Sequence, residues 1–544
     1  MQPSRFETHV VDNQPPAFAP RDLWGDDLAL REAVARGGAG AFAGRLQAYG
    51  TLAGDELYRL GFDANRDRPR LRTHDAQGRR IDLVEFHPAY HRLMEAAKAH
   101  GVAGLSWQEP VRGAHVARAA LAYLHHQAEA GTSCPLTMTH AAVPVLRQAP
   151  ALEAWARGAA TPAYDPRDIP MAEKTGLTLG MGMTEKQGGS DVRGNTTTAT
   201  LLPGGEAWQL VGHKWFFSAP MSDGFLVLAQ TPDGLGCFLL PRRLPDGSKN
   251  AFRLMRLKDK LGDWSNASSE VELCDALAWP VGEPGRGVAT IIPMVMLTRL
   301  DCMLAAAAQV RWAMANALHH ARHRKAFGRV LAGHPLMANV LADLAIESEA
   351  ATVFALDVAA AVEAGQGDPQ AAAYARVTTA VGKYWLCRRA PTLVNEAQEC
   401  LGGAGYVEES VLPRLYRQAP LNSIWEGSGN IQCLDVLRAL AREPRATQAL
   451  RVALERAAGL EPVLAREAGA IAGLLAGSQD VLEVRARYLV ERIALVLQGA
   501  ALHAAGSPVA EAFVRSRLDG AHGLAMGTLP PGIDFAAVME RALP

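Results

Sequence analysis

Cysteines, aromatic residues and net charge are all scarce in this chain of 544 residues. Its seven cysteines are scattered, and none of them forms a C-x-x-C pair. An odd, unclustered set of cysteines argues against a zinc site or a disulfide framework, and it favours a reducing compartment. We therefore expect no structural metal and a cytoplasmic protein.

An excess of charge of one sign is absent as well. Lys plus Arg amounts to 55 and Asp plus Glu to 56, which leaves a net charge of -1. Any affinity for nucleic acid or membrane must therefore be local. The most apolar stretch, residues 288–310, is interrupted by Arg299 and Asp301, and the N-terminus lacks the apolar core of a signal peptide. We expect no membrane span.

The chain changes character along its length. Residues 93–156 repeat apolar residues at helical spacing, whereas residues 177–280 hold short β-rich runs between turns that contain Pro and Gly. Helical patterns return at residue 288 and continue beyond residue 443, with a break near 506–508. The predicted fold is mainly α with a central antiparallel β domain. The predicted domains are an N-terminal helical domain (1–178), the β domain (179–284), a helical bundle (285–442) and a C-terminal helical extension (443–544).

A glycine-rich segment suggests a phosphate-bearing ligand. Residues 181–191 read M-G-M-T-E-K-Q-G-G-S-D, with hydroxyl groups at Thr184 and Ser190 that can donate to phosphate oxygens. The run G-H-K-W-F-F-S follows at residues 212–218. The alternative interpretation of both runs is an ordinary hairpin with aromatic residues in the core.

A single carboxylate marks the candidate chemistry. The run L-N-S-I-W-E-G-S-G-N-I-Q, residues 421–432, places Glu426 between Trp425 and Gly427. A carboxylate that is held desolvated against a flat ligand has a raised pKa and becomes a better base. By itself this tripeptide is also compatible with a plain turn.

Taken together, these runs resemble the acyl-CoA dehydrogenase family of flavoproteins over roughly residues 85–442. The resemblance implies FAD as the cofactor, and it implies a helical domain, an antiparallel β domain and a four-helix bundle. It gives Glu426 the role of catalytic base. It places these residues at the cofactor: Met183, Thr184, Gly189, Ser190, Phe216, Phe217, Ser218, Gly402, Gly403, Trp425, Gly427, Ser428 and Asn430.

The run H-R-K-A-F-G, residues 323–328, extends the resemblance to a second chain. Its counterpart in the family reaches the FAD of a neighbouring subunit. Arg324 would meet the diphosphate in a charge-assisted contact, and Phe327 would pack on the cofactor. This implies an oligomer, with a homotetramer expected. The alternative is an exposed basic helix end.

The implied reaction is the α,β-desaturation of an acyl-CoA. A base removes the α-proton while a hydride leaves the β-carbon for the flavin. Some members of the family carry the base on a bundle helix, at the position of Thr298 here, so Glu426 is the better candidate. Arg299 either supports the site or is a helix-surface arginine.

Two departures narrow the resemblance to one branch. Trp425 stands where ordinary members often have Tyr, and about 100 residues follow the usual end of the family. With that extension, the motifs resemble the alkylation-response branch of the family. This branch implies a tetrameric FAD protein that protects DNA against alkylation damage, binds double-stranded DNA through its C-terminal region and has weak acyl-CoA dehydrogenase activity. The small-molecule substrate would be an acyl-CoA or an alkylating agent.

The composition of the extension does not by itself predict DNA binding. Residues 445–544 hold ten Arg, no Lys and ten Asp plus Glu. Clustered arginines can nevertheless form a phosphate-binding face, and the spacing puts Arg485, Tyr488 and Arg492 on one helical face, with Arg515 and Arg517 close in sequence. The alternative is a solvated helix with intrahelical ion pairs. For Arg438, a position toward the site and a helix-capping role remain open.

Two rival functions remain. One is an ordinary catabolic acyl-CoA dehydrogenase with an unusual tail, which predicts fast flavin reduction by a defined acyl-CoA. The other is a non-catalytic flavoprotein that shields DNA, for which Glu426 would be dispensable.

Overall fold

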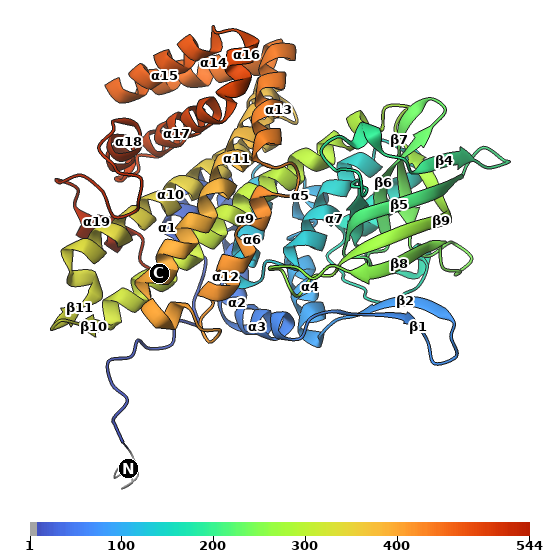
Figure 1. Cartoon of the computed structure of the whole chain (residues 1–544), viewed down its shortest axis with the longest axis horizontal. Helices are drawn as coiled ribbons and strands as arrows, with labels where there is room; N and C mark the ends of the chain where they lie inside the picture. The colour runs from blue at the N-terminus through green and yellow to red at the C-terminus, as the bar shows by residue number, and fades with distance from the viewer. Residues whose placement is uncertain (1–7) are drawn as a thin grey trace.

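A computed structural model describes residues 8–544. A helical N-terminal region leads into a β-sheet, a bundle of long helices and a further helical region (Figure 1). The hairpin formed by β1 (Arg70–His74) and β2 (Arg80–Glu85) was not predicted, because most of its residues are polar and apolar alternation is weak. The N-terminal helices are α1 (Leu28–Arg36), α2 (Ala43–Leu52), α3 (Tyr58–Arg66), α4 (Pro88–His100), α5 (Leu105–Gln108), α6 (Ala114–Ala128), α7 (Ser133–Leu146) and α8 (Glu153–Ala160).

The central sheet has seven strands and curls onto itself. Its order is β3-β6-β4-β5-β9-β7, with β8 paired to β9 and a further pairing between β6 and β7. Most pairings are antiparallel as expected, and in addition β6 runs parallel to β3 and meets β4 in parallel. The strands are β3 (Leu179–Gly182), β4 (Thr198–Leu201), β5 (Trp208–Ser218), β6 (Gly224–Thr231), β7 (Gly234–Pro241), β8 (Phe252–Leu257) and β9 (Ser268–Val281).

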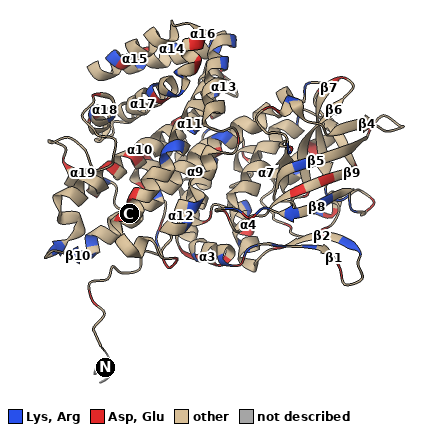
Figure 2. Ribbon diagram, in the orientation of Figure 1, with Lys and Arg blue, Asp and Glu red and all other residues tan. Residues whose placement is uncertain are grey.

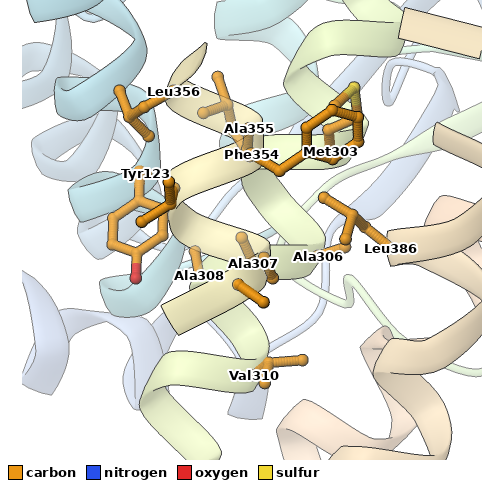
Figure 3. Packing of buried hydrophobic residues seen from close by; sticks show 14 of the residues in the cluster. Tyr123, Met303, Ala306, Ala307, Ala308, Val310, Phe354, Ala355, Leu356 and Leu386 are labelled. Atoms are coloured by element: carbon orange, nitrogen blue, oxygen red, sulfur yellow. The ribbon is translucent and has the colours of Figure 1, made fainter. Parts of the chain in front are cut away.

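Three long helices form the centre of the molecule. They are α9 (Gly287–His323), α10 (Pro335–Ala364) and α11 (Pro369–Cys400). Small side chains let these helices approach closely, and larger ones fill the gaps between them. Figure 3 shows Ala306 and Ala307 of α9 close to Phe354 of α10 and Leu386 of α11. A Cβ atom at Gly382 of α11 would lie 2.2 Å from Met303 Cε, so a larger residue there would displace the end of the Met303 side chain.

Helix α9 is long and apolar enough to cross a membrane by length and composition, but 72% of its most apolar window is buried inside the fold. Arg299 and Asp301, which we expected to interrupt this stretch, lie within the continuous helix. Their charges are accommodated because both form ion pairs with other elements. The apolar character of α9 is therefore explained by its central place in the bundle.

The C-terminal extension packs on the bundle mainly through α14, α17 and α19, and α18 makes a smaller contact. The expected break near 506–508 separates α17 from α18, so that prediction is confirmed. After the short helix α12 (Leu412–Gln418), the remaining helices are α13 (Gly429–Arg442), α14 (Pro444–Ala458), α15 (Pro462–Leu475), α16 (Gln479–Val484), α17 (Ala486–Ala504), α18 (Ala510–Leu518) and α19 (Phe535–Arg541).

A buried ion-pair network fastens the extension to α10. Arg517 of α18 reaches Asp343 and Glu347 of α10, with its Nε 2.8 Å from Glu347 Oε1. His522 Nε2 lies 2.8 Å from Asp343, and Arg389 lies 2.8 Å from Glu347. All of these side chains are buried or nearly so, and burial would raise the pKa of both carboxyl groups. The neighbouring cations instead hold the pKa of Asp343 and of Glu347 below its ordinary value.

Removing Arg517 leaves two buried carboxylates without their main partner. We expect Arg517→Ala to lower the free energy of unfolding by about 3–5 kcal/mol, measured by denaturant titration. The matched control is Arg451→Ala, which removes an exposed pair with Glu455 on α14 and should cost less than about 1 kcal/mol. Equal losses for the two variants would show that the network does not hold the extension in place.

Candidate active site

One large cavity of about 760 Å³ lies where the sheet, α9 and the segment before α13 come together. One side of α9 forms a wall of this cavity, from Val288 through Thr298 to Ala305. At a rise of about 1.5 Å per residue, this wall is roughly 25 Å long. Helices α6 and α7 and the loops of the sheet complete the lining. The cavity thus has room for both a flat cofactor and a second ligand.

The glycine-rich loop after β3 lies at this cavity as predicted. Its lining includes Met183, Thr184, Gly189 and Ser190, and from β5 it includes Phe216, whose side chain is 52% exposed. The hydroxyl groups of Thr184 and Ser190 form no hydrogen bond within the described residues. A Cβ atom at Gly189 would lie 2.5 Å from the Thr184 hydroxyl, so glycine keeps this donor accessible. Free hydroxyl donors, a glycine cradle and an exposed aromatic ring suit the phosphates and the ring of FAD.

A buried ion pair, which the sequence reasoning missed, supports the loop. Lys214 Nζ of β5 lies 2.7 Å from Glu185 Oε1, and neither side chain is exposed. Glu185 also accepts hydrogen bonds from the backbone of Thr196, at 2.7 Å, and of Thr197, at 3.2 Å. Burial alone would raise the pKa of Glu185, but Lys214 and these donors lower it to about 2. The pair fixes the loop directly next to Thr184.

The prediction for Phe217 is wrong. It was expected at the cofactor, but its side chain is fully buried and packs 4.2 Å from Phe225, centroid to centroid, inside the sheet. Successive side chains of a strand point to opposite faces. Since Phe216 and Ser218 face the cavity, the ring of Phe217 must point into the core.

Glu426 lies at the centre of the cavity wall on an unusual backbone. Its φ is +58°, a left-handed conformation that is costly for a residue other than glycine and is often found at functional sites. Its Oε2 accepts a hydrogen bond of 2.9 Å from Thr298 Oγ1, and its Oε1 accepts none within the described residues. Burial raises the pKa of this carboxyl above its ordinary value, although Thr298, Arg299 and Lys383 act in the opposite direction.

Three side chains clamp the turn that carries Glu426. Arg299 Nε donates to the Glu426 carbonyl at 3.0 Å, and Gln432 Nε2 donates to the same oxygen at 2.9 Å. Lys383 Nζ donates to the carbonyl of Trp425 at 2.7 Å and to that of Gly427. The backbone thus remains strained because donors from α9, α11 and α13 hold each of its carbonyls.

Arg299 belongs to the site and is not a surface arginine. Its Nη1 lies 2.7 Å from Asp435 Oδ2 of α13, and Arg376 of α11 binds the same carboxylate at 2.9 Å. All three side chains line the cavity, as does Arg438. The sequence left open whether Arg438 lies toward the site or caps its helix, and the structure places it in the cavity lining.

Of the residues predicted on either side of Glu426, the cavity lining includes Trp425, Gly427 and Ser428 but not Asn430. Asn430 is exposed, and it accepts a hydrogen bond of 2.7 Å from Arg487 of α17. The C-terminal extension therefore contacts the first turn of α13.

Arg324 and Phe327 do not reach this cavity in the same chain. Along α9, Thr298 and Arg324 lie roughly 40 Å apart at about 1.5 Å per residue. Phe327 is 97% exposed and has a φ of +50°, at the tip of the hairpin formed by β10 (Lys325–Ala326) and β11 (Arg329–Val330). Gly402 and Gly403 also lie outside the cavity, in an exposed turn after α11 where a Cβ atom would meet nothing within 4 Å.

The arginines expected to bind DNA do not form one face. Arg517 is buried in its ion pairs and cannot contact DNA, so that prediction is wrong. Arg492 is paired with Glu467 of α15, which balances its charge. Arg515 lies 3.9 Å from Glu511. Arg485 lies before the start of α17 and stacks over Tyr488 at 4.6 Å. Sequence spacing could not reveal the acidic partners of Arg492 and Arg517, which come from other helices, whereas Glu511 lies one turn before Arg515 on the same helix.

Three family descriptions match consecutive parts of the chain. They are the adaptive response protein AidB N-terminal domain at residues 13–166, the acyl-CoA dehydrogenase middle domain at 180–276 and the acyl-CoA dehydrogenase C-terminal domain at 285–441. A curated relative from Escherichia coli, the putative acyl-CoA dehydrogenase AidB, is 46% identical over 94% of this chain and 95% of its own length.

Solved structures agree in architecture. The crystal structure of ACDH-11 from Caenorhabditis elegans in complex with C11-CoA has a TM-score of 0.86 at 27% identity and covers 94% of this chain and 93% of its own. The apo-form of Bd2924 has a TM-score of 0.84 at 28% identity, over 92% of this chain and all of its own. The chain therefore belongs to the AidB branch of the acyl-CoA dehydrogenase family, which makes it an FAD-dependent oxidoreductase.

Proposed function

We propose that the protein removes hydrogen from the α and β carbons of an acyl-CoA thioester, with Glu426 as the base. The observation that supports this most is a desolvated carboxylate, fixed by Thr298, in the same cavity as the hydroxyl-rich loop. Glu426 Oε2 is occupied by the threonine, so Oε1 is the atom that is free to take the α-proton. FAD, when bound, supplies the acceptor for the hydride from the β-carbon.

The surroundings of Glu426 suit a base at neutral pH. Burial raises the pKa of Glu426, which strengthens it as a base, while the Thr298 hydroxyl, Arg299 and Lys383 favour its ionised form. Trp425 lies beside it in the cavity and helps to exclude water. The related ACDH-11 was solved with C11-CoA, which supports an acyl-CoA as the class of ligand.

We also propose a homotetramer in which the hairpin bearing Phe327 completes the FAD site of another subunit. An aromatic side chain that is 97% exposed on a left-handed backbone is unfavourable for an isolated chain. Packing against a partner would offset this cost. Arg324, which caps the C-terminal end of α9, would enter the same contact together with Phe327.

Double-stranded DNA binding in defence against alkylation is the second function we propose, and it rests on the similarity to AidB over nearly the whole chain. Figure 2 shows acidic and basic residues interspersed along α14–α18, so the extension has no uniformly basic face. Within the described residues, Arg485 and Arg487 form no ion pair. Arg485, which is one of the four predicted arginines, and Arg487, which is not, are therefore the candidate phosphate contacts.

Changing Glu426 to Gln should remove the base and keep the shape. We expect anaerobic reduction of the flavin by an acyl-CoA to slow by about 10²–10⁴-fold. The rate is measured as the loss of the visible flavin absorbance. FAD content should be unchanged, and Glu455→Gln on the distant helix α14 should react as the parent does. If no short, branched or long-chain acyl-CoA bleaches the parent protein, the proposed oxidation is wrong.

The Thr298 hydroxyl stabilises the ionised form of Glu426 and therefore lowers its pKa. Thr298→Val should raise that pKa, so the rate of flavin reduction should reach its plateau at higher pH than in the parent. At any pH below the new midpoint, less of the base is ionised and the rate should be lower. Thr298→Ser keeps the hydroxyl and should keep the parent profile. Identical pH–rate profiles for Thr298→Val and Thr298→Ser would show that the Thr298 hydroxyl does not set the pKa of Glu426.

Arg485→Ala combined with Arg487→Ala should weaken double-stranded DNA binding. Two lost phosphate contacts should reduce the slope of log affinity against log salt by about 1.8, measured by fluorescence anisotropy between low and moderate salt. Arg451→Ala, which removes an exposed charge elsewhere on the extension, is the matched control. Absence of DNA binding by the parent at low salt would contradict the DNA proposal and leave the proposed oxidation untouched.

A further inference from the structure

The N-terminal arm, which we define as residues 8–20, contains no helix or strand and lies against the end of α9. It is found at the same end of the molecule as the hairpin of β10 and β11 (Figure 1). That hairpin carries Phe327 at its tip and follows directly after Arg324. The motifs that resemble the acyl-CoA dehydrogenases begin near residue 85, so they assign no role to the arm.

One side chain of the arm clamps the hairpin. Asn13 Nδ2 donates a hydrogen bond of 2.9 Å to the Lys325 carbonyl, and the Lys325 N–H donates one of 2.7 Å to Asn13 Oδ1. A single amide thus gives Lys325 the donor and the acceptor that a neighbouring strand would otherwise supply. Asn13 has a φ of +50°, a left-handed conformation that asparagine tolerates better than most residues.

The same residue also orients Arg324. The backbone carbonyl of Asn13 accepts a hydrogen bond of 2.7 Å from Arg324 Nη1. Within residues 8–544, no carboxylate forms an ion pair with this guanidinium. A guanidinium has several N–H donors, and a carbonyl uses one of them without neutralising the charge. Arg324 is therefore held in a fixed direction and keeps its charge available for an anion.

The arm can hold Asn13 in place because it is anchored to the buried part of α9. Phe18 packs against Trp312, with ring centroids 4.8 Å apart, and Trp312 is 2% exposed. Farther along the helix, His319 Nε2 lies 2.9 Å from the Pro16 carbonyl. Only two residues separate Pro16 from Asn13, so the bundle sets the position of the clamp.

The hairpin needs such support. Each of its strands has two residues, and a two-stranded hairpin is at best marginally stable by itself. His334 Nε2 lies 3.0 Å from the Ala326 carbonyl. Asn13 and His334 therefore fix consecutive residues of β10, and Phe327 follows next. Without the clamp, the hairpin would have to be ordered when its exposed ring meets a partner, which costs conformational entropy.

We propose that Asn13 is a positioning residue, which directs Arg324 and Phe327 toward the FAD of another subunit. The inference rests on the proposed homotetramer and deepens it, because it identifies the element that prepares one chain for the cofactor of the next. Asn13 itself does not touch the cofactor. It reduces the ordering that the hairpin must undergo when subunits assemble.

The first test measures the FAD affinity of Asn13→Gly. Glycine accepts the left-handed backbone and keeps the carbonyl, so only the two side-chain hydrogen bonds are lost. Titration of the apo-protein with FAD, followed by the quenching of flavin fluorescence, should show an affinity about tenfold lower, as expected for two hydrogen bonds of ordinary net strength. An unchanged affinity would overturn the proposal. The matched control is Asp12→Ala, which changes an exposed neighbour without a hydrogen bond or ion pair in the described part of the chain and should bind FAD as the parent does.

A double-mutant cycle tests whether Asn13 acts through the hairpin. Arg324→Ala combined with Phe327→Ala should weaken FAD binding more than Asn13→Gly does. Adding Asn13→Gly to that pair should lower the affinity by less than about twofold, because side chains that are absent cannot be positioned. Full additivity would overturn the proposal, since Asn13 would then act independently of the two residues.

Mixed oligomers decide whether the effect crosses between chains. One chain carries Asn13→Gly and the other carries Thr184→Val, which removes a hydroxyl group from the cavity; the two chains are co-expressed with different tags and purified over both. The cavity of the first chain and the hairpin of the second together form an intact site, so a fraction of the sites should bind FAD with parental affinity. If Asn13 acted within its own chain, every site would carry a defect, and the absence of a parental class would overturn the proposal.

The two ways of failing are distinguishable by multi-angle light scattering. If the parent is monomeric, the proposed homotetramer is wrong and the positioning role falls with it. If the parent is tetrameric but Asn13→Gly binds FAD normally, only the role of Asn13 is wrong.

Discussion

Glu426 must stay ionisable inside a cavity while its backbone adopts a φ of +58°, and neither condition is favourable for a glutamate. The structure meets this constraint with donors from three helices. Arg299, Lys383 and Gln432 each bind carbonyls of the turn, and Asp435 in turn holds Arg299. The bundle helices α9, α11 and α13 therefore have to keep their mutual positions to within hydrogen-bond tolerance. The tight alanine and glycine packing between α9 and α11 supplies that rigidity.

The C-terminal extension shares this framework. Helix α18 is fixed to α10 by buried ion pairs, and α17 touches the first turn of α13 through Arg487 and Asn430. Helix α13 also carries Gln432 and Asp435, which hold the turn of Glu426 and its arginine. A displacement of α17 would therefore also displace α13, the helix that positions the base. The extension is mechanically part of the active-site scaffold, whatever else it binds.

The sequence predicted the parts of the site that depend on local motifs. The positions of Thr184, Ser190 and Glu426 at a cavity and the alternation of helical and sheet regions all follow from short-range patterns. Features that depend on distant partners could not be predicted. An arginine such as Arg517 is expected to be exposed when only its neighbours in sequence are considered. It is buried because its partners Asp343 and Glu347 lie on a helix about 170 positions earlier. The ring of Phe217 differs from that of Phe216 only through strand alternation, and the register of β5 fixes which of the two faces the cavity.

The charged groups of the cavity wall show why pairing matters more than polarity. Arg118 and Asp301 form an ion pair in which each satisfies the other, so the wall they form is nearly inert toward a ligand. Arg299 and Asp435 are paired in the same way beside Glu426. Glu426 differs from them, because its Oε2 binds only the Thr298 hydroxyl and its Oε1 accepts no hydrogen bond within the described residues. The reactivity of the cavity therefore depends on an oxygen that the protein has left without a partner, and the motif that marks the base carries no information about the pairs around it.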